Sequence, residues 1–288
     1  MTTQTYASVF EHTSDATFRA WGSELGTNLA AAGLVKTADT GQINWLTATR
    51  PASAGTAGGY EIWRFADSSL YLKIEYGTGG SALFPQMWLT VGTGSNGAGT
   101  LTGPQSTRGT VLNGTQPTSY AIAYSTYICR TADALAVCFK MGSQSAVYPA
   151  GAFIVGKSVD AAGASDGAGY AVWRYGASTV HTLQSVRISG AAFVGNAADL
   201  FTSIPGAPTN SLNGGNIQVY PMWMNLPEMR VFAFGVAYLV SEIAKLNTAP
   251  GVAMIGSVNH TYLALGQIAS SSFGGYTPST YSLAMIWE

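Results

Sequence analysis

YEIWRF, residues 60–65, has the side-chain alternation of a β-strand, and YAVWRY, residues 170–175, echoes it with a Gly before each stretch. Successive side chains of a strand point to opposite faces, so Trp63 shares its face with Glu61 and Phe65, while Arg64 lies on the other. Burying a Trp side chain contributes roughly 5 kcal/mol, whereas an Arg seldom lies in a core without a partner. The pattern therefore predicts that the Trp face is the inner one.

The second stretch gives the same prediction for Trp173 and Arg174. Similarity between the two stretches fades within a few residues on either side, whereas a true structural repeat extends over about 20 residues or more. We therefore interpret them as two similar strands, each anchored by its Trp, and expect neither Trp to touch a ligand.

The alternation continues in LYLKIEY, residues 70–76, where Leu70, Leu72, Ile74 and Tyr76 face one way. The 35 glycines and 11 prolines of the chain supply turns between further apolar stretches. These stretches predict more strands: QMWLTV (86–91), SYAIAYSTYIC (119–129), ALAVCFKM (134–141), GAFIVGKSV (151–159), TLQSVRIS (182–189), NIQVYPMWM (216–224), RVFAFGVAYLV (230–240), VAMIG (252–256), HTYLALG (260–266) and YSLAMIW (281–287).

One helix is predicted in TSDATFRAWGSELGTNLAAAGLV, residues 13–35. Ser14 or Asp15 can cap its first amides, and Gly33 can end it. Its apolar residues recur every three or four positions, which predicts an amphipathic helix that packs on its own sheet or docks another subunit: Phe18, Trp21, Leu25 and Leu29. The predicted fold class is thus mostly β, with β-sandwich-like antiparallel sheets and one N-terminal amphipathic α-helix.

Two stretches rich in Gly, Ser, Thr, Asn and Pro, residues 92–119 and 203–216, are predicted to be long loops. The first suggests three parts of the chain. Residues 1–95 form a helix plus β unit, residues 96–119 a linker or long loop, and residues 120–288 a larger β-sandwich-like domain.

The composition is poor in charge. Charged residues make up 9% of the 288 residues and the net charge is −1, against about 25% charged residues in an ordinary soluble domain. Both signs are scattered, which argues against nucleic-acid binding. A near-neutral surface favours association with copies of the chain or with neighbouring proteins, burying well over about 1,600 Å².

Neither the first residues nor the longest apolar run predicts a signal peptide or a membrane span. MTTQTYASVF lacks the basic start and apolar run of a signal peptide, and VFAFGVAYLV (231–240) is about half the length that spans a bilayer. We therefore expect neither export by that route nor membrane insertion.

Cys129 and Cys138 flank RTADALAV, which is predicted to form a hairpin turning near Ala132 and Asp133. In that register Cys129 lies opposite Ala136 and Cys138 opposite Tyr127. The two sulfurs are then diagonal neighbours, a poor arrangement for a disulfide, so both thiols are expected to stay reduced and buried.

Two motifs match enzyme signatures without the structural context that the chemistry needs. GTGSNG (92–97) fits a dinucleotide-binding turn, but the residues after it cannot start the helix that binds the phosphate. GASDG (163–167) fits a nucleophile elbow, with Ser165, Asp199 and His260 in hydrolase order, but it runs into a strand instead of a helix.

Metal ligands at suitable spacing are also missing. Asp160 and Asp166 match no calcium loop and fit a β-turn better, and the histidines His12, His181 and His260 lie far apart. We therefore predict no catalytic, cofactor-binding or metal site. The sequence does not exclude a pair of carboxylates of the kind that glycosidases use, because the 14 acidic residues allow many pairs.

Several segments resemble a virion structural protein family of tailed bacteriophages: FRAWGSELGTNLAAAGLVKTADTGQINW (18–45), GGYEIWRFAD (58–67), PQMWLTVGTGSNGAGTLTG (85–103), GAFIVGKSVDAAGASDGAGYAVWRY (151–175), and NHTYLALG (259–266) with the terminal WE. In that family the fourth segment is strand, Asp-Gly turn and strand, and the last is a closing hairpin. The resemblance implies a non-enzymatic, multicopy component of the tail, baseplate or fibre-attachment region. Its partners would be copies of itself and other virion proteins, assembled in the host bacterial cytoplasm.

Other functions fit the same scaffold. A carbohydrate- or receptor-binding module would stack aromatic side chains such as Trp223, Tyr276 or Tyr281 on a host surface glycan. A capsid decoration protein and a tail-associated depolymerase are further alternatives, although a depolymerase of this kind usually shows long β-helix repeats.

Overall fold

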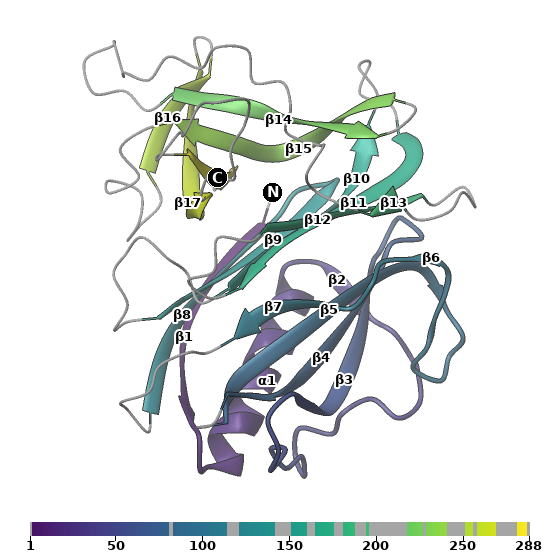
Figure 1. Cartoon of the computed structure of the whole chain (residues 1–288), viewed down its shortest axis with the longest axis vertical. Helices are drawn as coiled ribbons and strands as arrows, with labels where there is room; N and C mark the ends of the chain where they lie inside the picture. The colour runs from purple at the N-terminus through teal and green to yellow at the C-terminus, as the bar shows by residue number, and fades with distance from the viewer. Residues whose placement is uncertain are drawn as a thin grey trace.

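The structure is a computed structural model (Figure 1). It describes residues 2–80, 83–113, 121–141, 151–159, 165–175, 181–187, 194–195, 218–226, 229–240, 251–255, 258–268 and 281–286. The described chain is mostly antiparallel β-sheet with a helix near the N-terminus, which confirms the predicted fold class.

The smaller sheet has six strands in the order β2-β3-β4-β5-β6, and β7 also pairs with β5. All its pairings are antiparallel. Its strands are β2 (Leu34–Lys36), β3 (Thr56–Phe65), β4 (Tyr71–Gly79), β5 (Phe84–Ser95), β6 (Leu101–Gln105) and β7 (Gly109–Asn113).

The larger sheet has twelve strands and begins with β1-β8-β9-β10, after which it branches to β11 and β15. Its first part contains β1 (Thr2–Glu11), β8 (Ala121–Arg130), β9 (Ala134–Met141), β10 (Gly151–Val159), β11 (Ser165–Tyr175), β12 (His181–Arg187) and β13 (Val194–Gly195). The C-terminal strands are β14 (Gln218–Leu226), β15 (Met229–Val240), β16 (Gly251–Ile255), β17 (Val258–Ile268) and β18 (Tyr281–Ile286). Each apolar stretch predicted to be a strand contains one over the residues that the structure describes.

Helix α1 (Asp15–Ala31) follows β1 and lies beside it in Figure 1. Ser14 is its N-cap, because the Ser14 side chain accepts a hydrogen bond from the Thr17 amide at 3.3 Å. The predicted apolar stripe, including Phe18, Trp21 and Leu25, is fully buried inside the chain. The helix therefore packs on its own sheets, and the alternative of docking through that stripe is wrong.

The core lies between the six-stranded sheet, α1 and the first strands of the larger sheet. Trp63 and Trp173 are each 3% exposed and enter this core from opposite sheets, which confirms that the Trp faces are the inner ones. Trp173 packs so closely on β7 that a Cβ added at Gly109 would lie 2.1 Å from its ring. Arg64 is at the rim, as predicted, and its guanidinium donates to the carbonyls of Phe65 and Ala66.

The hairpin of β8 and β9 has the predicted register, with Cys129 opposite Ala136 and Cys138 opposite Tyr127. Both cysteines are buried thiols and do not form a disulfide. The Thr131 amide donates to the Ala134 carbonyl at 2.8 Å, which closes the turn where it was predicted.

The prediction of a loop over residues 92–119 is wrong in part. β5 continues to Ser95, and β6 and β7 lie within the stretch, because their backbones pair with β5 although their sequences are rich in turn residues. The N-terminal strand β1 pairs with β8 of the larger sheet. The proposed division into residues 1–95, 96–119 and 120–288 stays a prediction, and the second predicted loop, residues 203–216, lies outside the described residues.

Candidate functional site

Glu61 is the charged residue that lies deepest in the described core. It sits on β3 between Tyr60 and Ile62, on the same face as Trp63, and it is 1% exposed. A buried carboxylate is costly unless it is paired and hydrogen-bonded. Its surroundings therefore decide whether this side chain is a reactive group or a structural one.

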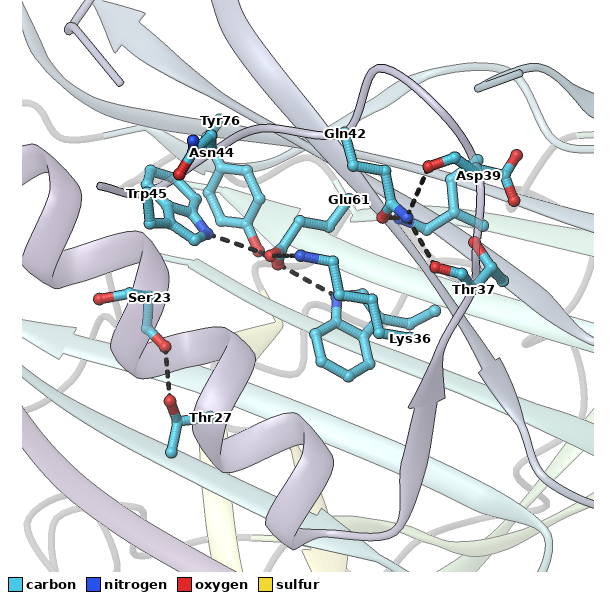
Figure 2. A network of polar contacts seen from close by, with 12 residues as sticks. Ser23, Thr27, Lys36, Thr37, Asp39, Gln42, Asn44, Trp45, Glu61 and Tyr76 are labelled. Atoms are coloured by element: carbon cyan, nitrogen blue, oxygen red, sulfur yellow. Dashed lines mark hydrogen bonds and ion pairs between the residues drawn. The ribbon is translucent and has the colours of Figure 1, made fainter. Parts of the chain in front are cut away.

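Four donors converge on the Glu61 carboxylate, as Figure 2 shows for three labelled partners. Lys36 Nζ donates to Oε1 at 2.6 Å, and Trp45 Nε1 donates to the same oxygen at 3.0 Å. The Tyr76 hydroxyl donates to Oε2 at 2.7 Å, and Trp63 Nε1 at 3.2 Å.

The four donors come from four different segments of the chain, and the local structure of each segment fixes the position of its donor. Lys36 lies on β2, whose register places it opposite Trp63. Tyr76 lies on β4, next to the core face of β3. Trp45 lies in the segment between β2 and β3, which Gln42 fixes to β3 by accepting the Ile62 amide at 2.8 Å.

Two glycines of α1 allow the helix to reach this cluster. A Cβ added at Gly22 would lie 2.0 Å from the Trp45 ring, and one at Gly26 would lie 3.3 Å from Glu61 Oε2. The indole of Trp45 therefore occupies the space that a side chain at Gly22 would need.

The chemistry of this cluster is that of an anchor. A carboxylate offers about four lone-pair sites, and the Glu61 carboxylate accepts four hydrogen bonds from side chains of the fold, so both of its oxygens are engaged internally. Lys36 balances the charge. Burial, and then the negative charge of Glu61, raise the pKa of Tyr76 well above its ordinary value, so the phenol stays a donor.

A second cluster surrounds Asp39. This residue lies between β2 and β3 and contacts the glycine-rich turn between β5 and β6. Asp39 Oδ1 accepts hydrogen bonds from the Ser95 hydroxyl and, at 3.1 Å, from the Gly99 amide. Burial opposes ionisation, but the hydrogen bonds from Ser95 and from the Gly99 amide outweigh it and hold the pKa of Asp39 below its usual value. Gly99 has φ +85°, and a Cβ there would lie 2.0 Å from the Tyr60 hydroxyl oxygen.

A third cluster joins the two sheets. Lys157 on β10 donates to Asp67, in the turn between β3 and β4, at 2.9 Å, and lies 3.7 Å from Asp133. Arg130 approaches Asp67 at 3.9 Å and covers the Phe65 ring at 4.2 Å. The hydrogen bond from Lys157, followed by its charge, lowers the pKa of Asp67.

None of the described residues of the enzyme-like motifs lies at the start of a helix. GTGSNG ends β5 and leads into β6, not into a helix. Ser165 opens β11 and pairs with Val159, so it is not at a strand-to-helix elbow. His260 lies on β17 opposite Ala253, and Asp199 lies outside the described residues.

The remaining candidates are also separated. Asp166 and Gly167 lie within β11 at a register shift between β10 and β11, so the Asp-Gly turn expected there is wrong, while Asp160 lies outside the described residues. His12 lies in the turn before α1 and His181 at the start of β12. No group of three or more His, Cys, Asp or Glu suited to a metal ion occurs among the residues that the structure describes.

The aromatic residues considered for sugar stacking lie in the C-terminal part. Trp223 is on β14 and Tyr281 begins β18, whereas Tyr276 lies outside the described residues. Within the described residues no helix has both the length and the apolar composition needed to cross a membrane.

The Glu61 cluster has no motif in the sequence, because its donors come from positions 36, 45, 63 and 76, which only the fold brings together. One signal was present in the sequence. Glu61 shares the Trp face of YEIWRF, and a charge on a core face requires partners.

In comparisons with known proteins, no family model, no curated protein and no solved structure matches the chain.

Proposed function

We propose that this chain is a non-enzymatic structural component of a tailed-bacteriophage virion, present in many copies in the tail, baseplate or fibre-attachment region. Its partners are copies of itself and other virion proteins. The proposal originates in the resemblance of the segments around residues 18–45 and 151–175 to such proteins.

The observation that carries the proposal is the low content of charged residues in a large, mostly β protein. Charged residues make up 9% of the chain, and three of its acidic residues are engaged in internal contacts: Glu61, Asp39 and Asp67. A protein that lies among neighbours in a particle needs few surface charges to stay soluble alone. The same composition would be a liability for a free enzyme at high concentration.

Mass spectrometry of purified particles tests this proposal. Particles from a host culture that expresses the chain are banded by density, disrupted, and separated into heads and tails. We expect peptides of this chain in the tail fraction at many copies per particle. Recovery only from the soluble lysate would contradict the proposal, and recovery with the heads would favour the decoration alternative.

A glycan array separates the structural role from the carbohydrate-binding alternative. The purified chain is expected to show no saturable binding to host surface glycans, and incubation with host polysaccharide is expected to release no reducing sugar. Saturable glycan binding would favour the receptor-binding module, and sugar release would favour the depolymerase.

A further inference from the structure

β1 forms an edge of the larger sheet. It pairs with β8 over its whole length, from Thr2 opposite Arg130 to Glu11 opposite Ala121, without a register shift. It also ends the strand order, so within the described part of the chain no strand pairs with its outer edge. Such an edge presents a row of backbone donors and acceptors to solvent.

The direction of these groups follows from Glu11. The Glu11 amide donates to Thr17 Oγ1 at 2.9 Å, and the Glu11 carbonyl accepts from the Ser14 amide at 3.1 Å, so both point away from β8. In an antiparallel pair this orientation recurs at every second residue. Thr3, Thr5, Ala7 and Val9 therefore direct their amides and carbonyls to the outer edge.

Apart from its end at Glu11, where Ser14 and Thr17 at the start of α1 take up the outward carbonyl and amide, β1 lacks the sequence features that usually protect an edge. It is ten residues long, contains no Lys, Arg, Pro or Gly, and carries its one charge on the last residue. The edges of the six-stranded sheet are protected: β2 has three residues and includes Lys36, while β6 has five residues, a Pro and a register shift against β5. Of these three edges in the described part of the chain, β1 is the one that its sequence leaves open to pairing.

We propose that β1 pairs antiparallel with β1 of a second copy, which joins the two larger sheets across a two-fold axis near Tyr6. This inference rests on the proposed multicopy role and specifies one of its contacts. With residue 6 opposite residue 6, Thr5 pairs with Ala7 and Thr3 with Val9 of the second copy. These outward-facing residues form about eight backbone hydrogen bonds.

A second copy suits this edge better than an unrelated strand, because antiparallel pairing about a two-fold axis makes one edge complementary to itself. In this register, core-face residues lie opposite core-face residues, and exposed Thr5 and Ala7 lie opposite each other. The two Glu11 carboxylates lie at opposite ends of the ribbon, about 34 Å apart, so they do not repel.

Sedimentation velocity of the purified full chain tests the pairing over about 1 to 100 μM. The parent is expected to form a dimer. Ala7→Pro removes an amide that points away from β8, so the fold is retained while the dissociation constant rises at least about tenfold. Val9→Lys, which places a charge on the 47% exposed Val9, is expected to weaken the dimer as well.

Ala30→Lys is the control, because Ala30 is exposed and belongs to α1, not to the strand that would pair. It adds the same charge and is expected to leave the dimer intact, and near-ultraviolet circular dichroism verifies that each variant keeps the parent core. A parent that is monomeric, or trimeric, would overturn the pairing, as would a dimer that Ala7→Pro does not weaken. If the chain is nevertheless found in particles at many copies, the proposed function stands and this contact alone fails.

Discussion

At the scale of single residues, Glu61 is the common acceptor of its cluster, so replacing it measures how much the cluster stabilises the fold. Glu61→Gln keeps the shape of the side chain but removes the charge and points an amide at groups that donate. We expect the free energy of unfolding to fall by about 2 to 3 kcal/mol, since hydrogen bonds to a charged group are the strong ones. Urea denaturation followed by tryptophan fluorescence measures this.

Glu75→Gln is the matched control, because Glu75 forms an ion pair with Arg108 at 2.7 Å on the outer face of the sheet, where the Arg108 side chain is 41% exposed. A pair of this kind contributes at most about 1 kcal/mol. If both variants cost the same, the buried cluster is not the stronger interaction.

Two buried tyrosines differ in what their hydroxyls do. The Tyr76 hydroxyl donates to Glu61, whereas the Tyr124 hydroxyl makes no hydrogen bond within the described structure. Tyr76→Phe is expected to cost about 2 kcal/mol, and Tyr124→Phe to leave stability unchanged or to raise it. Thermal unfolding of the two variants provides the comparison, and a larger loss for Tyr124→Phe would contradict it.

Trp63 both fills the core and donates to Glu61. Trp63→Ala is expected to lower the free energy of unfolding by about 3 to 5 kcal/mol, because it leaves a cavity and removes one donor. Arg64→Ala is expected to be milder, since Arg64 lies at the rim. A Trp63 variant that melts within a degree or two of the parent would show that Trp63 is not an anchor.

At the scale of elements, Gly22 of α1 stabilises the fold, although a glycine inside a helix usually destabilises it. Gly→Ala in an exposed helix raises stability by about 1 kcal/mol. Gly22→Ala is expected instead to lower it by about 1 to 3 kcal/mol, because the new methyl group would overlap the Trp45 ring. Denaturant titration measures the change.

Thr27→Ala serves as the comparison on the same helix. Thr27 is exposed and its hydroxyl bonds back to the Ser23 carbonyl at 2.9 Å, so alanine is expected to be neutral or stabilising. A stabilising Gly22→Ala would mean that Trp45 does not pack against the helix.

Elements with a strong local pattern could be predicted from the sequence. The cap and apolar stripe of α1, the alternation of β4 and the register of the hairpin of β8 and β9 all follow from neighbouring residues. Elements that depend on a distant partner could not. β6 and β7 have loop-like sequences and become strands by pairing with β5, and β1 becomes a strand by pairing with β8.

The candidate site shows the same limit. Glu61 could be placed on the core face of β3, but Lys36, Trp45 and Tyr76 meet it only after β2, the following segment and β4 have come together. No spacing in the sequence encodes that convergence. The placement of Trp63 and Trp173 could be predicted because alternation and burial alone determine it.

At the scale of the whole molecule, the pairing of β1 with β8 and the shared core indicate that the first 119 residues depend on the strands C-terminal to them. A fragment of residues 1–119 keeps α1 and the six-stranded sheet but loses the strand that pairs with β1. It also loses the core residues of the larger sheet, which include Phe139, Phe153 and Trp173. We expect this fragment to show no cooperative unfolding transition and weak protection of its amides from hydrogen exchange.

A fragment of residues 1–187 is the matched comparison, because it ends with β12 and retains β1, β8–β11 and the six-stranded sheet. It is expected to unfold in one cooperative transition, since one continuous core links both sheets and the charge cluster of Lys157 and Asp67 ties β10 to the turn after β3. Circular dichroism during thermal unfolding distinguishes the fragments. If residues 1–119 instead fold cooperatively alone, the two parts of the chain are independent domains, and the contacts between the sheets form an interface between domains.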